Sequence, residues 1–103
     1  MSEYELINGL MSGLTLLLAT GNYPEELCHQ LSHLISALSN FWRMYLHSTD
    51  AGEKRVYLKL VLSFLSTRLE AFKAYPRLAH YLRFMLALLR TTYFSSLVLA
   101  PSR

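Results

Sequence analysis

Apolar residues recur along the chain at intervals of three and four, the spacing that places side chains on one face of an α-helix. Segments with this pattern lie at residues 3–19, 24–46, 51–74 and 76–94, and no segment alternates as a half-buried strand does. Because the connections between them are short, neighbouring helices are expected to run antiparallel. The sequence therefore predicts an all-α fold, an antiparallel up-down bundle of three to four helices in a single domain spanning residues 1–103.

The expected helix ends carry residues that satisfy unpaired backbone groups. Ser2 and Glu5 have the spacing of a capping box, and Asp50 and Glu53 repeat it before the third segment. Gly21 follows the first segment, where many helices end on a glycine with a positive φ. These signals predict the starts of the first and third helices and the end of the first.

The region around Pro76 leaves the number of helices open. Proline ends or bends a helix, because it lacks an amide hydrogen and pushes the preceding residue toward extended geometry. A turn at Pro76 gives four helices, whereas a kink gives three with a long last one. Residues 78–89 are mostly apolar, so this last helix is expected to be the central helix of the bundle or an oligomer interface. Residues 95–103 are expected to fray.

The scarcity of charge adds an expectation about assembly. Charged residues make up 17% of the 103-residue chain, against about 25% in a typical soluble domain. So few charges leave apolar surface, which is expected to be buried in a homodimer or against a protein partner. A single cysteine and the lack of an apolar run long enough to span a bilayer predict a soluble cytoplasmic protein.

The residues that catalysis needs are missing or isolated. Asp50 is the only aspartate and is accounted for by a helix cap, and no serine or cysteine lies at a strand-to-helix turn. Adjacent residues on a helix do not face each other, so His29 is not placed to activate Cys28. Cys28 is therefore expected to be a small buried residue. The sequence predicts no enzymatic activity, no cofactor and no small-molecule substrate.

Two motifs at helical spacing have structural interpretations. His29 and His33 lie one turn apart, as two metal ligands on a helix do, yet zinc sites need three or four ligands. Both fall on the polar face of the second segment, so solvated histidines and no metal are expected. Gly9 and Gly13 form a GxxxG motif, which predicts close approach of the first helix to a neighbour.

The two halves of the chain carry opposite net charge. Residues 1–52 contain five acidic residues and one arginine, whereas residues 53–103 contain nine lysines and arginines and two glutamates. No acidic residue follows Glu70. Basic side chains with tyrosines nearby are typical of a nucleic-acid surface. The alternative interpretation is that the acidic and basic halves pair with each other, within the fold or across a dimer.

Two groups of residues are candidates for contacting a partner, because aromatic residues and arginine are preferred anchors in protein interfaces. One group lies late in the second segment, where Trp42 is expected to be the most exposed aromatic residue. The other is a basic edge of the last helix. The candidate partner-binding residues are Trp42, Tyr45, Arg77, Tyr81, Arg83 and Arg90.

The function that agrees best with these patterns is a non-enzymatic protein–protein interaction module. It would act as an adaptor, a chaperone-like protein or a regulatory subunit, dimeric or bound to a partner. The alternative is a small helical DNA- or RNA-binding protein, such as a viral accessory factor, that uses the basic C-terminal half. A membrane-surface role is disfavoured, because the basic helices lack a clean division into polar and apolar faces.

Overall fold

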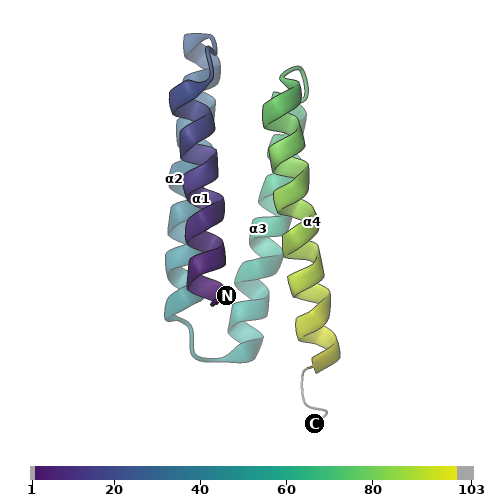
Figure 1. Ribbon diagram of the computed structural model, residues 1–103. Helices are drawn as coiled ribbons and strands as arrows, with labels where there is room; N and C mark the ends of the chain where they lie inside the picture. Colours follow the sequence, from purple (N-terminus) through teal and green to yellow (C-terminus); the bar gives the residue numbers. More distant parts are fainter. Residues whose placement is uncertain (1, 100–103) are drawn as a thin grey trace. The chain divides into compact units, whose positions relative to one another are not determined.

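The chain folds into helices joined by short connections. The computed structural model describes residues 2–99, and within them the side chains of residues 2–97. Its helices are α1 (Glu3–Thr20), α2 (Glu25–His47), α3 (Ala51–Phe72) and α4 (Pro76–Leu99) (Figure 1). No strand occurs in residues 2–99. The predicted fold class, all-α with antiparallel helices packed as in a bundle, is confirmed.

Two compact units divide the chain, Met1–Arg43 and Met44–Arg103. The first contains α1 and most of α2, and the second contains the end of α2 together with α3 and α4. Within each unit the helices run antiparallel and side by side (Figure 1), as short connections between amphipathic helices favour. The grouping of residues 1–103 into a single domain stays a prediction.

Both expected N-caps are present. The Ser2 hydroxyl oxygen accepts a hydrogen bond from the Glu5 amide at 3.1 Å, and the Asp50 carboxylate accepts one from the Glu53 amide at 2.8 Å. Each bond satisfies one of the amides that a helix start leaves without an intrahelical partner. The local sequence therefore determines where α1 and α3 begin.

Gly21 ends α1, but not with the predicted positive φ. Its φ is −78° and its ψ is 139°, and the described chain contains no positive-φ residue. Its amide donates to the Leu17 carbonyl at 2.8 Å. A Cβ at this position would collide with the ring of Tyr23 and lie 2.7 Å from the Leu17 carbonyl oxygen. Glycine is favoured here by the close approach of the Leu17 carbonyl oxygen and the Tyr23 ring, not by a positive φ.

Pro76 marks a turn and not a kink. The Tyr75 amide donates to the Phe72 carbonyl at 3.0 Å, and the Tyr75 carbonyl accepts from the Ala79 amide at 2.9 Å. Residues 2–99 therefore form four helices, with α3 ending at Phe72, two residues earlier than predicted. Residues 95–99 continue α4 beyond its predicted end at residue 94, and the fraying of residues 95–103 stays a prediction. Residues 100–103 lie outside the described part of the chain.

Apolar side chains at intervals of three and four form the core. The buried apolar residues of the first unit are Ile7, Leu10, Leu14, Leu27, Leu31, Leu34, Leu38 and Trp42. Those of the second unit are Tyr45, Leu58, Val61, Leu65, Phe72, Leu78, Ala79, Leu82, Met85, Leu86 and Leu89. Fully burying one large apolar side chain contributes about 1.5–3 kcal/mol, so these faces supply most of the stabilisation.

α4 buries only one of its faces, and its exposed side carries the apolar residues Phe84, Phe94 and Leu97. Of the two predicted roles, that of a central helix is wrong, because a central helix would be covered on all sides. The role of an oligomer interface stays a prediction. Residues 2–99 contain no helix with the length and hydrophobicity needed to cross a membrane.

Candidate protein-binding surface

The outward side of α4 carries a continuous line of exposed side chains. The α4 stripe, as we call it, consists of Arg83, Ala87, Arg90, Phe94 and Leu97. Successive members are four or three residues apart, so all five lie on one side of the helix. Phe94 is 60% exposed and Leu97 is 43% exposed. The stripe is thus cationic in its N-terminal half and apolar in its C-terminal half.

Among the described residues, no carboxylate forms an ion pair with the cationic half of the α4 stripe. No acidic residue follows Glu70, and in the described part of the chain neither Arg83 nor Arg90 forms an ion pair. Guanidinium groups stay ionised at any physiological pH. The two arginines are seven residues apart, about 10.5 Å along the helix axis. The stripe therefore offers two fixed positive charges at a defined separation.

A second exposed group lies on the neighbouring flank of α4. There the Tyr81 and Phe84 rings have centroids 6.5 Å apart and a tilt of 51°, and partial burial raises the pKa of the Tyr81 phenol by desolvation. Arg77 belongs to this flank. It is six residues before Arg83, which places the two side chains roughly 120° apart around the helix. The predicted basic edge through Arg77, Arg83 and Arg90 is therefore split between two flanks.

Trp42 and Tyr45, two of the predicted partner-binding residues, are buried. Trp42 is 3% exposed and Tyr45 is 5% exposed, so the prediction that Trp42 is the most exposed aromatic residue of α2 is wrong. The buried line of α2 passes from Leu38 to Trp42, and the half-buried Phe41 lies at its edge. The Lys54 ammonium group lies 5.0 Å from the centroid of the Tyr45 ring. Both aromatic residues belong to the core.

The exposed apolar residues of α4 were missed by the sequence analysis, because a mostly apolar helix gives no contrast between its faces. The arginines provide a signal that could have identified them. Arg83 and Arg90 mark the outward side, and Ala87 and Phe94 follow them at a spacing of four residues. Residues at that spacing share a face, so Phe94 must also point outward.

A shallow groove lies along α1 and α2 in the first unit. Its volume is about 470 Å³. The residues that line this α1 groove are Asn8, Met11, Ser12, Thr15, Leu16, Ala19, Ile35 and Ser39. None of them is charged, and Leu16 is 62% exposed. The groove is therefore an uncharged depression beside an exposed apolar side chain.

Gly9 lies on the exposed side of α1. A Cβ built on it has no atom within 4 Å outside its own local backbone. The predicted close approach of α1 to a neighbouring helix is therefore wrong at Gly9. Since an exposed glycine inside a helix costs about 1 kcal/mol relative to alanine, packing within this chain does not account for it.

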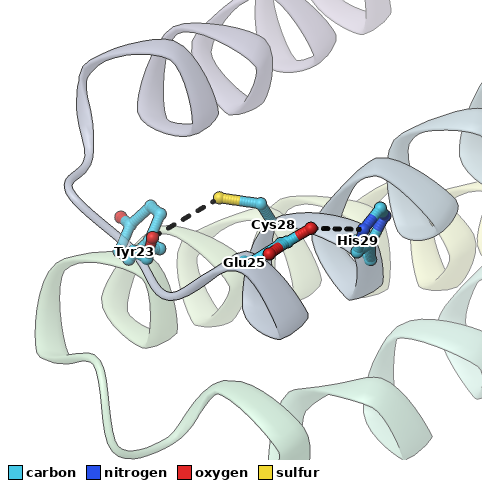
Figure 2. A network of polar contacts seen from close by, with 4 residues as sticks. All are labelled: Tyr23, Glu25, Cys28 and His29. Carbon is cyan, nitrogen blue, oxygen red and sulfur yellow. Dashed lines mark hydrogen bonds and ion pairs between the residues drawn. The ribbon is translucent and has the colours of Figure 1, made fainter.

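The start of α2 contains the polar contacts shown in Figure 2. The Cys28 thiol points toward the Tyr23 carbonyl oxygen, with the sulfur at 3.7 Å, while His29 Nε2 lies 3.7 Å from Glu25 Oε1. The thiol thus meets a carbonyl group, and the imidazole meets a carboxylate one helical turn earlier. Cys28 is half-buried, not fully buried as predicted. These contacts do not form a nucleophile–base pair.

His29 and His33 are both exposed, which agrees with their prediction as solvated side chains. In the part of the chain that the structure describes, no three histidine, cysteine or acidic residues are grouped closely enough to bind a metal ion.

Comparison with protein-family models, with curated proteins and with solved structures gave no match.

Proposed function

We propose that this protein is a non-enzymatic protein–protein interaction module that binds its partner through the α4 stripe. The observation that carries the proposal is the combination of two arginines and two large exposed apolar side chains on one face of one helix. Arginine and aromatic residues dominate the energetics of protein interfaces. An adaptor, chaperone-like protein or regulatory subunit would use such a surface.

The chemistry of the stripe defines its partner. Phe94 and Leu97 lose solvent contact only if an apolar surface covers them, and each contributes up to about 1.5–3 kcal/mol when fully buried. Arg83 and Arg90 are complemented by carboxylates about 10.5 Å apart, the separation of residues i and i+7 on a helix. An acidic amphipathic helix satisfies both requirements, and its charge speeds and orients the encounter.

The nucleic-acid alternative agrees less well with this surface. Nucleic-acid surfaces carry clustered cations, whereas the arginines of α4 are divided between two flanks and have the exposed Phe84 and Phe94 beside them. The apolar C-terminal half of the α4 stripe would not be stabilised by contact with a phosphate backbone. The alternative remains a measurable outcome, because electrostatic binding to DNA or RNA weakens steeply as salt rises.

The test is a binding titration with a defined probe. The probe is a labelled helical peptide of about 20 residues, long enough to be helical in water, with glutamates at i and i+7 and leucines between them. Wild-type protein is expected to bind it. The double variant Arg83→Glu/Arg90→Glu is expected to lose at least about tenfold in affinity, or 1.4 kcal/mol. Lys59→Glu, on the exposed side of α3, is the control for net charge and should bind as wild type does.

The proposal fails if no binding is seen at a peptide concentration of about 1 mM. A dissociation constant of that size corresponds to a binding free energy of only about 4 kcal/mol. It also fails if Lys59→Glu weakens binding as much as a single reversal at Arg83. Tighter, salt-sensitive binding of duplex or single-stranded nucleic acid than of the peptide would support the alternative instead.

A further inference from the structure

Leu16 is an exposed apolar side chain in an uncharged part of the chain. It is 62% exposed, and no charged residue lies within seven positions of it. Every other large apolar side chain that the structure shows as exposed has a charged residue within that range, as Leu60 has Lys59 and Phe84 has Arg83. Because burying an unpaired charge is costly, a partner that covers Leu16 must itself be uncharged where it touches α1.

The outward side of α1 meets this requirement itself. Its exposed residues between positions 8 and 20 are small, polar or apolar, and none is charged. The exposed side of α2 has no lysine, arginine or acidic residue over residues 29–40, but no large apolar side chain is exposed there. The exposed apolar residues of α3 and α4 have lysine or arginine nearby. Among the described helices, α1 thus combines an exposed apolar side chain with an uncharged surround.

Gly9 and Leu16 place an open position and a protruding side chain on one face of α1. Seven residues separate them, so they lie two turns, or about 10.5 Å, apart on the same side. A Cβ built on Gly9 has no atom within 4 Å outside its own local backbone. If a second α1 lies antiparallel to the first and centred near residue 12, each Leu16 lies over the Gly9 of the other copy. A side chain then enters an open position twice, as knobs enter holes in packed helices.

The charges of α1 favour this antiparallel orientation. Glu3 and Glu5 lie at the start of the helix, and the rest of it carries no charge. In the antiparallel pair the two Glu5 residues are about 22 Å apart along the axis, more than twice the Debye length of about 8 Å at physiological ionic strength. A parallel pair would bring the four glutamates together, place Leu16 against Leu16 and leave Gly9 open.

The α1 groove borders the same face. Its lining includes Ser12, Leu16 and Ala19, so a helix that lies along this face also covers the edge of an uncharged depression. Ser12 lies near the middle of the antiparallel pair, and its small side chain permits a close approach of the two helix axes.

We propose that the outward side of α1 is a contact between two copies of this chain, packed antiparallel about a two-fold axis near Ser12. Such a contact is closed, because the same face serves both copies. It uses a different helix from the α4 stripe and goes beyond the proposed function. One helix meeting one helix buries less than the roughly 1,600 Å² of a standard interface, so a dissociation constant on the order of 100 μM is expected. At the low micromolar concentrations of an unfolding measurement the copies are therefore separate.

The experiment exchanges the sizes of the two facing residues. Gly9→Leu places leucine against leucine at both positions of the pair, and Leu16→Ala leaves both open positions empty. Each variant alone is expected to have a dissociation constant at least about tenfold higher than wild type. An equimolar mixture of the two, and also the double variant Gly9→Leu/Leu16→Ala, again places one large side chain against one small one at each position. Both samples are expected to associate as wild type does, which sedimentation equilibrium measures.

Matched controls make the same changes in size elsewhere. Ser36→Leu adds a leucine to the exposed side of α2, and Leu60→Ala removes an exposed leucine from α3. Both should associate as wild type does, as should Arg83→Glu/Arg90→Glu, which leaves α1 unchanged. The double variant contains both changes on α1, so its association excludes unfolding as the reason why either single variant dissociates.

Three results would overturn the inference: a wild-type monomer at about 1 mM, ten times the expected dissociation constant; a mixture or a double variant that stays monomeric; or controls that dissociate as the α1 variants do. A wild-type monomer would leave an uncharged segment of another protein as the occupant of this face. The proposed function is tested separately, because Gly9→Leu and Leu16→Ala leave the α4 stripe unchanged and a monomer can still bind the acidic peptide.

Discussion

The ring of Tyr23 occupies the space that a Cβ atom on Gly21 would need. Gly21 has an ordinary negative φ, so the backbone angle alone does not require glycine. A Cβ atom would also lie 2.7 Å from the Leu17 carbonyl oxygen, which belongs to the backbone and moves less readily than the Tyr23 ring. The glycine at this helix end is thus explained by the close approach of the Leu17 carbonyl group and of a side chain two residues later.

Gly21→Ala is therefore expected to destabilise the protein. The added methyl group must displace the Tyr23 ring or the end of α1, and overpacking of this kind typically costs about 1–3 kcal/mol. Chemical denaturation followed by circular dichroism measures the change in the free energy of unfolding. Asn22→Ala, an exposed neighbour, serves as the control and should change stability by less than about 0.5 kcal/mol. Equal stability of Gly21→Ala and wild type would show that Tyr23 does not restrict this position.

Gly9→Ala is expected to have the opposite effect. Gly9 lies inside α1 with open space beside it, so alanine gains helix propensity without a clash. The expected stabilisation is about 0.5–1 kcal/mol. Chemical denaturation measures the change in the free energy of unfolding. Destabilisation would mean that a neighbouring group fills the space beside Gly9.

Trp42 is the only tryptophan, so its fluorescence reports directly on its burial. Its emission is expected to be blue-shifted and poorly quenched by acrylamide in the folded protein, and to become accessible on unfolding. Trp42→Ala should cost about 3–5 kcal/mol, as large-to-small changes of buried aromatic residues do. Met44→Ala, at a side chain that is 49% exposed, is the control. Strong quenching of the fluorescence by acrylamide in the folded state would show that Trp42 is exposed and would contradict the prediction.

The raised pKa of Tyr81, caused by desolvation, predicts a loss of stability at alkaline pH. Below the usual tyrosine value of 10.0 the phenol is neutral in both states and contributes no pH dependence. As pH rises from there through the folded-state pKa, the unfolded chain ionises first, so the free energy of unfolding falls. Tyr81→Phe should remove that part of the alkaline decline. Identical slopes for variant and wild type would contradict the prediction.

The helix starts could be predicted from the sequence, whereas the burial or exposure of individual side chains could not. Ser2 and Asp50 act on amides three residues away, and such contacts are determined locally. The burial of Trp42 was predicted wrongly because Trp42 directly follows Phe41, and one step along the chain turns a helix by only about 100°. Only packing decides which of the two adjacent aromatic side chains turns inward.

In the candidate site too, some residues could be identified from the sequence and others only from the packing of the helices. The arginines of α4 were identified because charge is visible in the sequence, and Arg83 and Arg90 do share an exposed face. Phe94 and Leu97 were missed, because nothing local distinguishes an outward apolar residue from an inward one. The end of α4 at Leu99 also lay beyond the predicted helix, since no glycine follows residue 94 and Pro101 is the first breaker.

The most direct test of the central claim is a map of the amide chemical-shift changes that the acidic peptide causes in the protein. The largest shifts are expected along the α4 stripe, at Arg83, Ala87, Arg90, Phe94 and Leu97. Shifts concentrated on the exposed side of α3 around Val56 and Leu60, with the α4 stripe unchanged, would contradict the account.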